Sequence, residues 1–156
     1  MKERELMKYS GESSMLLFLN FLKSNNHEMY SISKEDIKKV EQMAGEKLPE
    51  EYRIFLEIGG NGVRFLKGSS YDITEVFNLK KWANELLEED NSDEVLSTND
   101  FIFFMHQGYQ FYFFKLNEGD NPPVYFYEEG KNEKRIIKKF NCLSDFFIAD
   151  YNCEIV

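Results

Sequence analysis

The stretch Ile32–Gly62, ISKEDIKKVEQMAGEKLPEEYRIFLEIGGNG, contains two amphipathic helices and a glycine-rich loop in one continuous pattern. Ser33 is placed to cap the first helix, with Asp36 at the capping-box position three residues later. Gly45 offers the left-handed conformation that ends a helix. Pro49 suits the start of the next helix, where its missing N–H costs nothing. The sequence therefore predicts a helix, a turn and a second helix before the loop.

Each predicted helix carries an apolar face. The apolar positions recur at helical spacing, at Ile37, Val40 and Met43 in the first helix and at Tyr52, Phe55, Leu56 and Gly59 in the second. Because both faces need to be buried, we expect the two helices to share one core on which the rest of the chain docks.

The second helix also carries a motif. Its residues are Leu48, Pro49, Tyr52, Phe55 and Leu56, followed by Asn61-Gly62, which gives LP-x-x-Y-x-x-FL and an NG loop. Later pieces are FMHQGYQF at 104–111, PPVY at 122–125, and the apolar positions Phe140, Leu143, Phe146 and Phe147. In this order and spacing, they resemble the SUKH superfamily over roughly residues 28–150.

The SUKH resemblance implies a cytoplasmic domain that binds other proteins. The superfamily is named after a yeast cell-wall-synthesis regulator, and most bacterial members resemble immunity proteins that neutralise toxins. The chain departs from the simplest family pattern through its N-terminal extension and its acidic insert before Asn99.

The remaining segments predict the fold class. We expect helices at 14–23, 80–90 and 140–151, extended segments at 63–66 and 71–78, a turn at 68–70, and strands at 101–105, 109–116, 124–127 and 134–138. The predicted class is α+β, with an antiparallel β-meander sheet packed with N-terminal helices and a closing C-terminal helix. We expect one face of the 101–116 hairpin to lie under helices and the other, rich in aromatic residues, to be partly open. The helix at 14–23 either covers the core or forms a dimer contact.

Composition limits the function. At 156 residues we expect one SUKH-like domain, 1–156, with residues 1–12 frayed. The net charge of −9 argues against nucleic-acid binding, which depends on Lys and Arg at the phosphates, and favours basic partners. The sequence lacks an apolar run of the ~20 residues that a membrane span needs, and it lacks a signal-peptide core. We therefore predict a cytoplasmic protein without a membrane partner.

The polar residues do not suggest catalysis or a bound group. Cys142 and Cys153 stand apart, without a Cys-x-x-Cys or His/Cys cluster, so we interpret them as reduced thiols and predict no metal site and no cofactor. His106 is read as a hairpin residue that hydrogen-bonds locally, since the spacing offers it no nucleophile. The glycines of the loop around Asn61, which are Gly59, Gly60 and Gly62, are attributed to positive φ after a helix. We predict that the protein is not an enzyme.

An acidic run is the main candidate for partner binding. Residues 85–94 contain six Asp or Glu and no Lys or Arg. The run is either a solvated helix end and loop, or a patch that steers a basic toxin domain. Affinity would also need aromatic anchors, for which we expect exposed tyrosines in the meander. The predicted partner-binding residues are Glu88, Glu89, Asp90, Asp93, Glu94, Tyr109, Tyr112 and Tyr125.

These observations give three functional hypotheses. The first is a non-catalytic immunity (antitoxin) protein that neutralises the catalytic domain of a cognate bacterial toxin. A nuclease is favoured because its basic groove would complement an acidic surface. The alternative is an intracellular regulatory or scaffold module that binds a host protein. The third is an enzyme that uses His106, for which His106→Ala would abolish an activity. A second copy of the chain is a further possible partner, which would give a homodimer.

Overall fold

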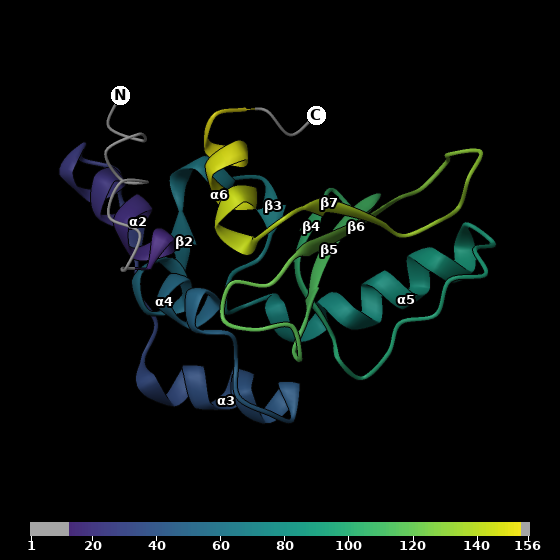
Figure 1. Ribbon diagram of the computed structural model, residues 1–156, viewed down its shortest axis with the longest axis horizontal. Helices are drawn as coiled ribbons and strands as arrows, with labels where there is room; N and C mark the ends of the chain where they lie inside the picture. Colours follow the sequence, from purple (N-terminus) through teal and green to yellow (C-terminus); the bar gives the residue numbers. More distant parts are fainter. Residues whose placement is uncertain (1–12, 154–156) are drawn as a thin grey trace.

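The computed structural model describes residues 13–153, so the predicted fraying of residues 1–12 lies outside the described part. Figure 1 shows the order of the elements. The helices are α2 (Ser14–Ser24), α3 (Lys34–Ala44), α4 (Glu50–Gly59), α5 (Leu79–Glu89) and α6 (Leu143–Tyr151), with 3₁₀ helices η1 (Arg64–Leu66) and η2 (Val76–Asn78). The strands are β1 (Met29–Tyr30), β2 (Gly62–Val63), β3 (Ser69–Ser70), β4 (Asp100–His106), β5 (Gln110–Lys115), β6 (Val124–Glu128) and β7 (Ile137–Phe140).

The central sheet is antiparallel and has the order β3-β4-β5-β6-β7. β4 and β5 form the predicted hairpin, in which Phe101 lies opposite Phe114 and His106 opposite Gln110. β6 and β7 continue the meander, and among the strands of residues 13–153 only β6 pairs with β7. With α6 closing the chain, the predicted α+β class and the antiparallel meander are confirmed.

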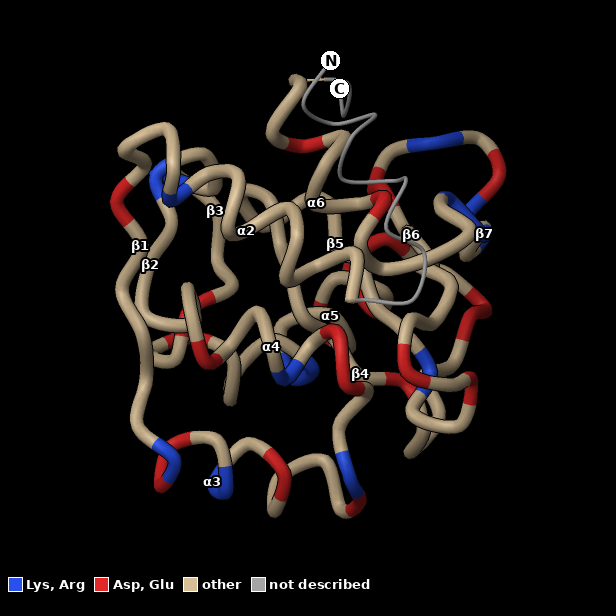
Figure 2. The backbone as a smooth tube through the Cα atoms, turned by 60° about the vertical axis from the view of Figure 1, so that its left-hand side comes forward, with Lys and Arg blue, Asp and Glu red and all other residues tan. Residues whose placement is uncertain are grey.

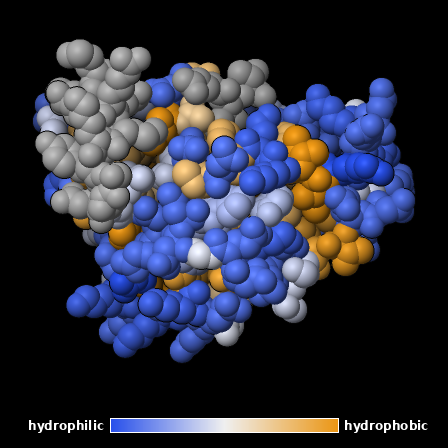
Figure 3. All heavy atoms as spheres, viewed as in Figure 1, coloured by the Kyte–Doolittle hydropathy of each residue, from blue (hydrophilic) through white to orange (hydrophobic). Residues whose placement is uncertain are grey.

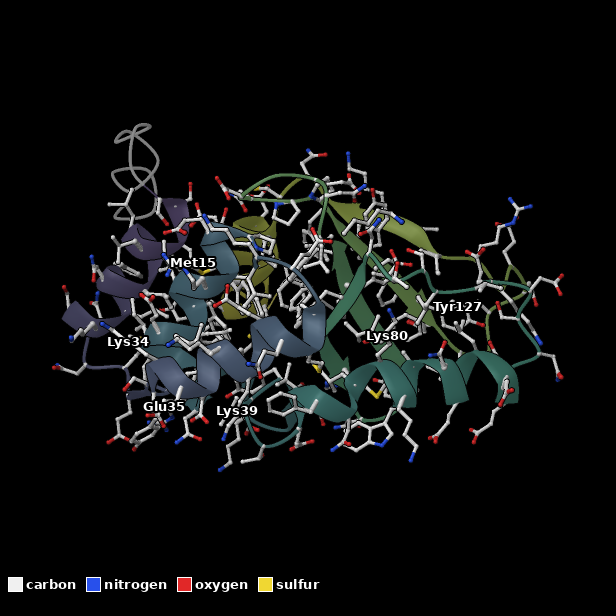
Figure 4. All side chains as sticks on the ribbon, turned by 90° about the horizontal axis from the view of Figure 1, so that it is seen from below. Met15, Lys34, Glu35, Lys39, Lys80 and Tyr127 are labelled. Carbon is white, nitrogen blue, oxygen red and sulfur yellow. The ribbon has the colours of Figure 1, made fainter. Side chains whose placement is uncertain are left out.

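The α3–α4 pair forms as the sequence predicts. Ser33 Oγ accepts a hydrogen bond of 3.1 Å from the backbone N–H of Asp36, and Gly45 ends α3 with a φ of 81°. Figure 4 shows Lys34, Glu35 and Lys39 on the outer side of α3. The prediction that Met43 belongs to the buried face is wrong, since Met43 is 42% exposed and lines a small cavity near η2.

Helices cover both faces of the sheet (Figure 1). On one face, the ring of Tyr52 in α4 lies 5.1 Å from that of Phe114, and the ring of Phe146 in α6 lies 5.0 Å from that of Phe103. On the other face α5 packs against the sheet through its buried residues, which are Leu79, Ala83, Leu86 and Leu87. The prediction that one face of the hairpin is partly open is therefore wrong. Helix α5 lies over that face, and β4 and β5 are buried except at their last residues.

The segment between α4 and α5 differs from its prediction. Of the predicted extended segment 63–66, only Val63 lies in a strand, β2, which pairs with β1, and the chain then turns into η1. Ser69 and Ser70, predicted as a turn, form β3, whereas residues 71–78, predicted as extended, form turns and η2. Tyr71 explains the compact path, because its hydroxyl accepts from the backbone N–H of Val63 and donates to the carbonyl of that residue.

The predicted helix at 14–23 is α2, and its apolar face packs inside the chain. Met15, Phe18, Leu19 and Leu22 are fully buried, and α2 lies against α4 and α6. Glu51 of α4 is buried and accepts hydrogen bonds from Ser13 Oγ and from the backbone N–H groups of Ser14 and Met15. A carboxylate at this position satisfies free amides and the positive end of the helix dipole. The core-covering interpretation of this helix is the one that the packing supports.

Candidate protein-binding surface

The acidic run lies at the C-terminal end of α5 and in the loop that follows it. Glu85, Glu88 and Glu89 are exposed on α5, and Asp93 is exposed in the loop. Figure 2 shows acidic residues along this part of the backbone, below β7. Four carboxylates of the run are therefore accessible to a partner.

Asp90 is instead bound within the protein. The Tyr127 hydroxyl of β6 donates to its carboxylate, as does the backbone N–H of Gly130. The Lys134 ammonium donates to the Asp90 carbonyl oxygen at 2.6 Å. The Tyr127 hydrogen bond lowers the pKa of Asp90, whereas burial and the neighbouring carboxylate raise the pKa of Tyr127 to about 12. Tyr127 is thus a neutral donor to a charged acceptor at neutral pH.

Glu94 is also held within the chain. Its carboxylate accepts a hydrogen bond of 2.5 Å from the backbone N–H of Ile136, just before β7. Ser92 Oγ donates to the Lys134 carbonyl oxygen at 2.8 Å. Together with Asp90, these contacts fasten the loop after α5 to the β6–β7 connection. The acidic run thus supplies both a structural clamp, through Asp90 and Glu94, and an exposed acidic surface.

A shallow hollow separates α5 from this loop. It has a volume of about 560 Å³, and its walls include Lys81, Asn84, Glu85, Leu87, Glu88, Ser92, Glu94 and Val95. Val95 is 85% exposed, the highest value among the large apolar residues that reach the surface. The hollow therefore combines acidic side chains with an apolar side chain.

The three predicted tyrosines do not form one exposed group. Tyr112 is 1% exposed and packs between Phe126 and Phe146, with ring centroids at 4.8 and 4.9 Å, so the prediction that it is an exposed anchor is wrong. Its side chain points to the face that α6 covers. Tyr125 and Tyr109 are half-buried.

Tyr125 and Tyr109 also belong to different surroundings. The Tyr125 ring stacks on Phe113, and its hydroxyl donates to Glu118 at 2.9 Å. Tyr109 lies at the β4–β5 turn beside His106, with ring centroids 5.5 Å apart. Neither tyrosine lines the hollow beside the acidic run.

The sequence reasoning missed two exposed apolar side chains. Ile137 in β7 is 49% exposed, and the hydrogen bond between Glu94 and Ile136 brings Val95 close to that strand. Figure 3 shows hydrophobic atoms gathered in a band beside β7. We call Val95, Ile136 and Ile137, with the exposed acidic residues Glu85, Glu88, Glu89 and Asp93, the clamp surface. The available signal was Val95, followed by Leu96, in an otherwise polar loop. The sequence does not show that β7, about 40 residues later, lies beside it.

His106 has a serine partner that the spacing did not predict. Its Nδ1 lies 2.9 Å from Ser69 Oγ, and the two residues are cross-strand partners in β3 and β4. A serine–histidine pair that acts in catalysis needs a further group to orient the histidine. Within residues 13–153, Ser69 is the only hydrogen-bond partner of the His106 ring, and the sheet register accounts for this contact.

The glycine-rich loop borders a hollow of about 800 Å³, whose lining includes Tyr30, Asn61 and Arg64. Gly62 has a φ of 143°, as the prediction of positive φ requires. That explanation is wrong for Gly59 and Gly60, which continue the helical geometry of α4. A Cβ at Gly59 would lie 2.5 Å from a Val63 methyl, and one at Gly60 would lie 2.6 Å from the Leu56 carbonyl oxygen. Close packing therefore requires these two glycines.

The described residues 13–153 contain no group of three His, Cys, Asp or Glu side chains that could hold a metal ion. Both cysteines are free, with Cys142 directly before α6 and Cys153 after it. None of the helices described is long and apolar enough to cross a membrane.

Comparison with known proteins gives one match. Residues 31–149 match the sequence model of the SMI1 / KNR4 family (SUKH-1). The matched region contains α3, α4, the five-stranded sheet and most of α6. No curated protein matches the chain. The matched region begins after α2, so the helix that Glu51 caps precedes the family match.

Proposed function

Because this chain belongs to the SMI1 / KNR4 family (SUKH-1), we propose that it is a non-catalytic immunity protein that binds the catalytic domain of a cognate bacterial toxin. The SUKH resemblance favours this role, since most bacterial members resemble immunity proteins. We place the protein in the cytoplasm, where it would meet a toxin made by the same cell or delivered by a competitor.

The observation that carries this proposal is the composition of the clamp surface. Protein interfaces join a small apolar centre to a polar rim that excludes water from it. Val95 and Ile137 are exposed apolar side chains, and Glu88 and Asp93 are exposed carboxylates nearby in the chain. The hydrogen bonds of Asp90 and Glu94 hold this surface in place, which reduces the entropy lost on binding.

Charge favours a basic partner, and a nuclease in particular. A nuclease binds its substrate through Lys and Arg at the phosphates, so its groove is positive. Four exposed carboxylates within one short segment of a chain of net charge −9 would attract such a groove. Electrostatic steering of this kind raises association rates by about tenfold to a thousandfold at low salt.

The test is co-expression with the toxin encoded beside this gene in a toxin-sensitive bacterium. We expect the wild-type protein to restore growth and the variant Val95→Glu to restore it poorly, because a charge would then occupy the apolar centre. The control is Met43→Glu, which changes an exposed apolar residue on α3. Growth that is not restored by the wild-type protein would overturn the proposal and favour a regulatory module that binds a host protein.

A further inference from the structure

The β6–β7 connection and β7 form a basic segment in an acidic protein. Residues 131–139, KNEKRIIKK, contain five Lys or Arg and one Glu. Figure 2 shows these basic residues at the margin of the molecule, on and before β7. Five of the chain's 19 basic residues thus lie within nine of its 156 residues, and an even spread would place only about one there.

Two of the five basic side chains form neither an ion pair nor a cation–π contact within residues 13–153. Lys131 pairs with Glu128 at 3.0 Å, Lys134 binds Asp90, and the Lys139 ammonium lies 4.9 Å from the centre of the Phe126 ring. Arg135 and Lys138 are exposed and form no ion pair with any residue in the range 13–153. Their positive charges are available to a partner.

The backbone of β7 itself is also available on its outer side, whereas just before β7 the Ile136 N–H and the Lys134 carbonyl are bound by Glu94 and Ser92. β7 is the last strand of the sheet, and β6 is its only neighbour among the described strands. An edge strand presents a row of unpaired N–H and C=O groups that can bind another extended chain. Ile137, 49% exposed, adds an apolar contact at the same edge.

We propose that the outer edge of β7 binds an extended acidic segment of a partner protein by strand addition. The backbone of that segment would pair with β7, and its Asp or Glu side chains would lie near Arg135 and Lys138. Opposite charges on adjacent strands stabilise the pairing. This contact goes beyond the proposed recognition of a basic domain, because it uses basic side chains and the strand backbone, and it shares Ile137 with the clamp surface.

The same charges argue against a second copy of this chain as the occupant. Two β7 strands paired edge to edge would bring the lysines of one strand against those of the other. Like charges opposite each other destabilise a strand pair, and lysines on an edge are a common protection against such association. The positive charges of β7 therefore disfavour pairing with a second β7 strand and favour pairing with an acidic strand.

The experiment measures binding of a fluorescent synthetic peptide of alternating Val and Glu, long enough to span β7. We expect Arg135→Glu/Lys138→Glu to weaken binding by about tenfold, which is the loss expected for two reversed charge contacts. The matched control is Lys38→Glu/Lys47→Glu, which has the same net charge but alters exposed lysines on and after α3. Equal weakening by both variants would contradict a site at β7.

A second measurement separates strand addition from simple charge attraction. Hydrogen exchange of the β7 amides should slow when the Val-Glu peptide binds. A peptide with proline at the Val positions cannot form the backbone pairing, so we expect it to bind weakly and to leave these amides unchanged. Equally tight binding of the proline peptide, or exchange at β7 that the Val-Glu peptide does not slow, would overturn the proposal. Failure of the toxin co-expression test would leave this result unaffected.

Discussion

The hydroxyl of Tyr127 in β6 donates a hydrogen bond to the carboxylate of Asp90, the residue that ends α5. This contact joins the helix on one face of the sheet to the strand next to the edge. Since Asp90 precedes the acidic loop, the contact also fixes where that loop begins.

Tyr127→Phe should therefore destabilise the protein while leaving the ring packing intact. We expect the melting temperature to fall by about 3–12 °C, as for loss of one hydrogen bond to a charged group. Thermal unfolding followed by circular dichroism measures this. The control is Tyr109→Phe, because the Tyr109 hydroxyl forms no hydrogen bond with the described residues; an equal fall in both variants would contradict the role of the Tyr127 bond.

The Glu94 contact predicts a local effect. Glu94→Ala removes the acceptor for the backbone N–H of Ile136, so exchange of that amide should accelerate, by about tenfold or more. Asp93→Ala, which changes an exposed neighbour, should leave the amide unchanged. Hydrogen exchange followed by NMR resolves this position. Unaltered exchange in Glu94→Ala would show that the loop is held to β7 by other contacts.

The sequence predicts the α3–α4 unit and the meander because their signals are local. Capping by Ser33, the stop at Gly45 and the alternation of strands can all be read over a few residues. The position of α5 is not local in this sense. Its apolar stripe shows that it is buried on one side, but not which face of the sheet it covers, and this explains why the hairpin face was misassigned. Tyr112 was misassigned because its burial depends on Phe146 of α6, more than about 30 residues later in the chain.

The candidate site was predictable in part for the same reason. The acidic run is visible in the sequence, and the exposure of Glu85, Glu88 and Glu89 follows from helical spacing. The engagement of Asp90 and Glu94 depends on partners about 40 residues away, at Tyr127 and Ile136. The proximity of Val95 to β7 depends on those same contacts.

Phe146 should be the largest single contributor from α6 to the core. It is fully buried, and its ring contacts those of Phe103, Phe104 and Tyr112. Phe146→Ala should reduce the free energy of unfolding by about 3–5 kcal/mol, through lost burial and the cavity that remains. Denaturant titration measures this, with Phe77→Ala as the control because Phe77 is 40% exposed. Similar losses in both would contradict the assignment of Phe146 to the core.

Asp150 predicts a dependence of stability on pH. Burial raises the pKa of this carboxyl to about 6, above its ordinary value of 3.8. The folded protein therefore holds this proton at pH values where the unfolded chain has released it, so this group's contribution to stability falls as pH rises from about 4 to about 6. Above that range the loss is complete and constant.

Asp150→Asn should consequently stabilise the protein at pH 7.5 relative to wild type, by a few degrees in melting temperature, with almost no difference below about pH 4. Because both proteins contain the same other acidic groups, the contributions of those groups cancel when the two melting temperatures are subtracted. A gain that is the same at both pH values would show that the substitution acts through packing or hydrogen bonding and not through ionisation of Asp150.

The most direct measurement is the affinity of the toxin's catalytic domain for the wild-type protein and for Glu88→Lys/Asp93→Lys, by titration calorimetry at low and at physiological salt. We expect the wild-type protein to bind tightly, with an affinity that falls as salt rises. The variant should bind about tenfold or more weakly, and its affinity should depend less on salt. Glu41→Lys/Glu46→Lys, with the same net charge, should bind like the wild type at each salt concentration. Equal affinities for all three proteins would contradict recognition through the acidic part of the clamp surface.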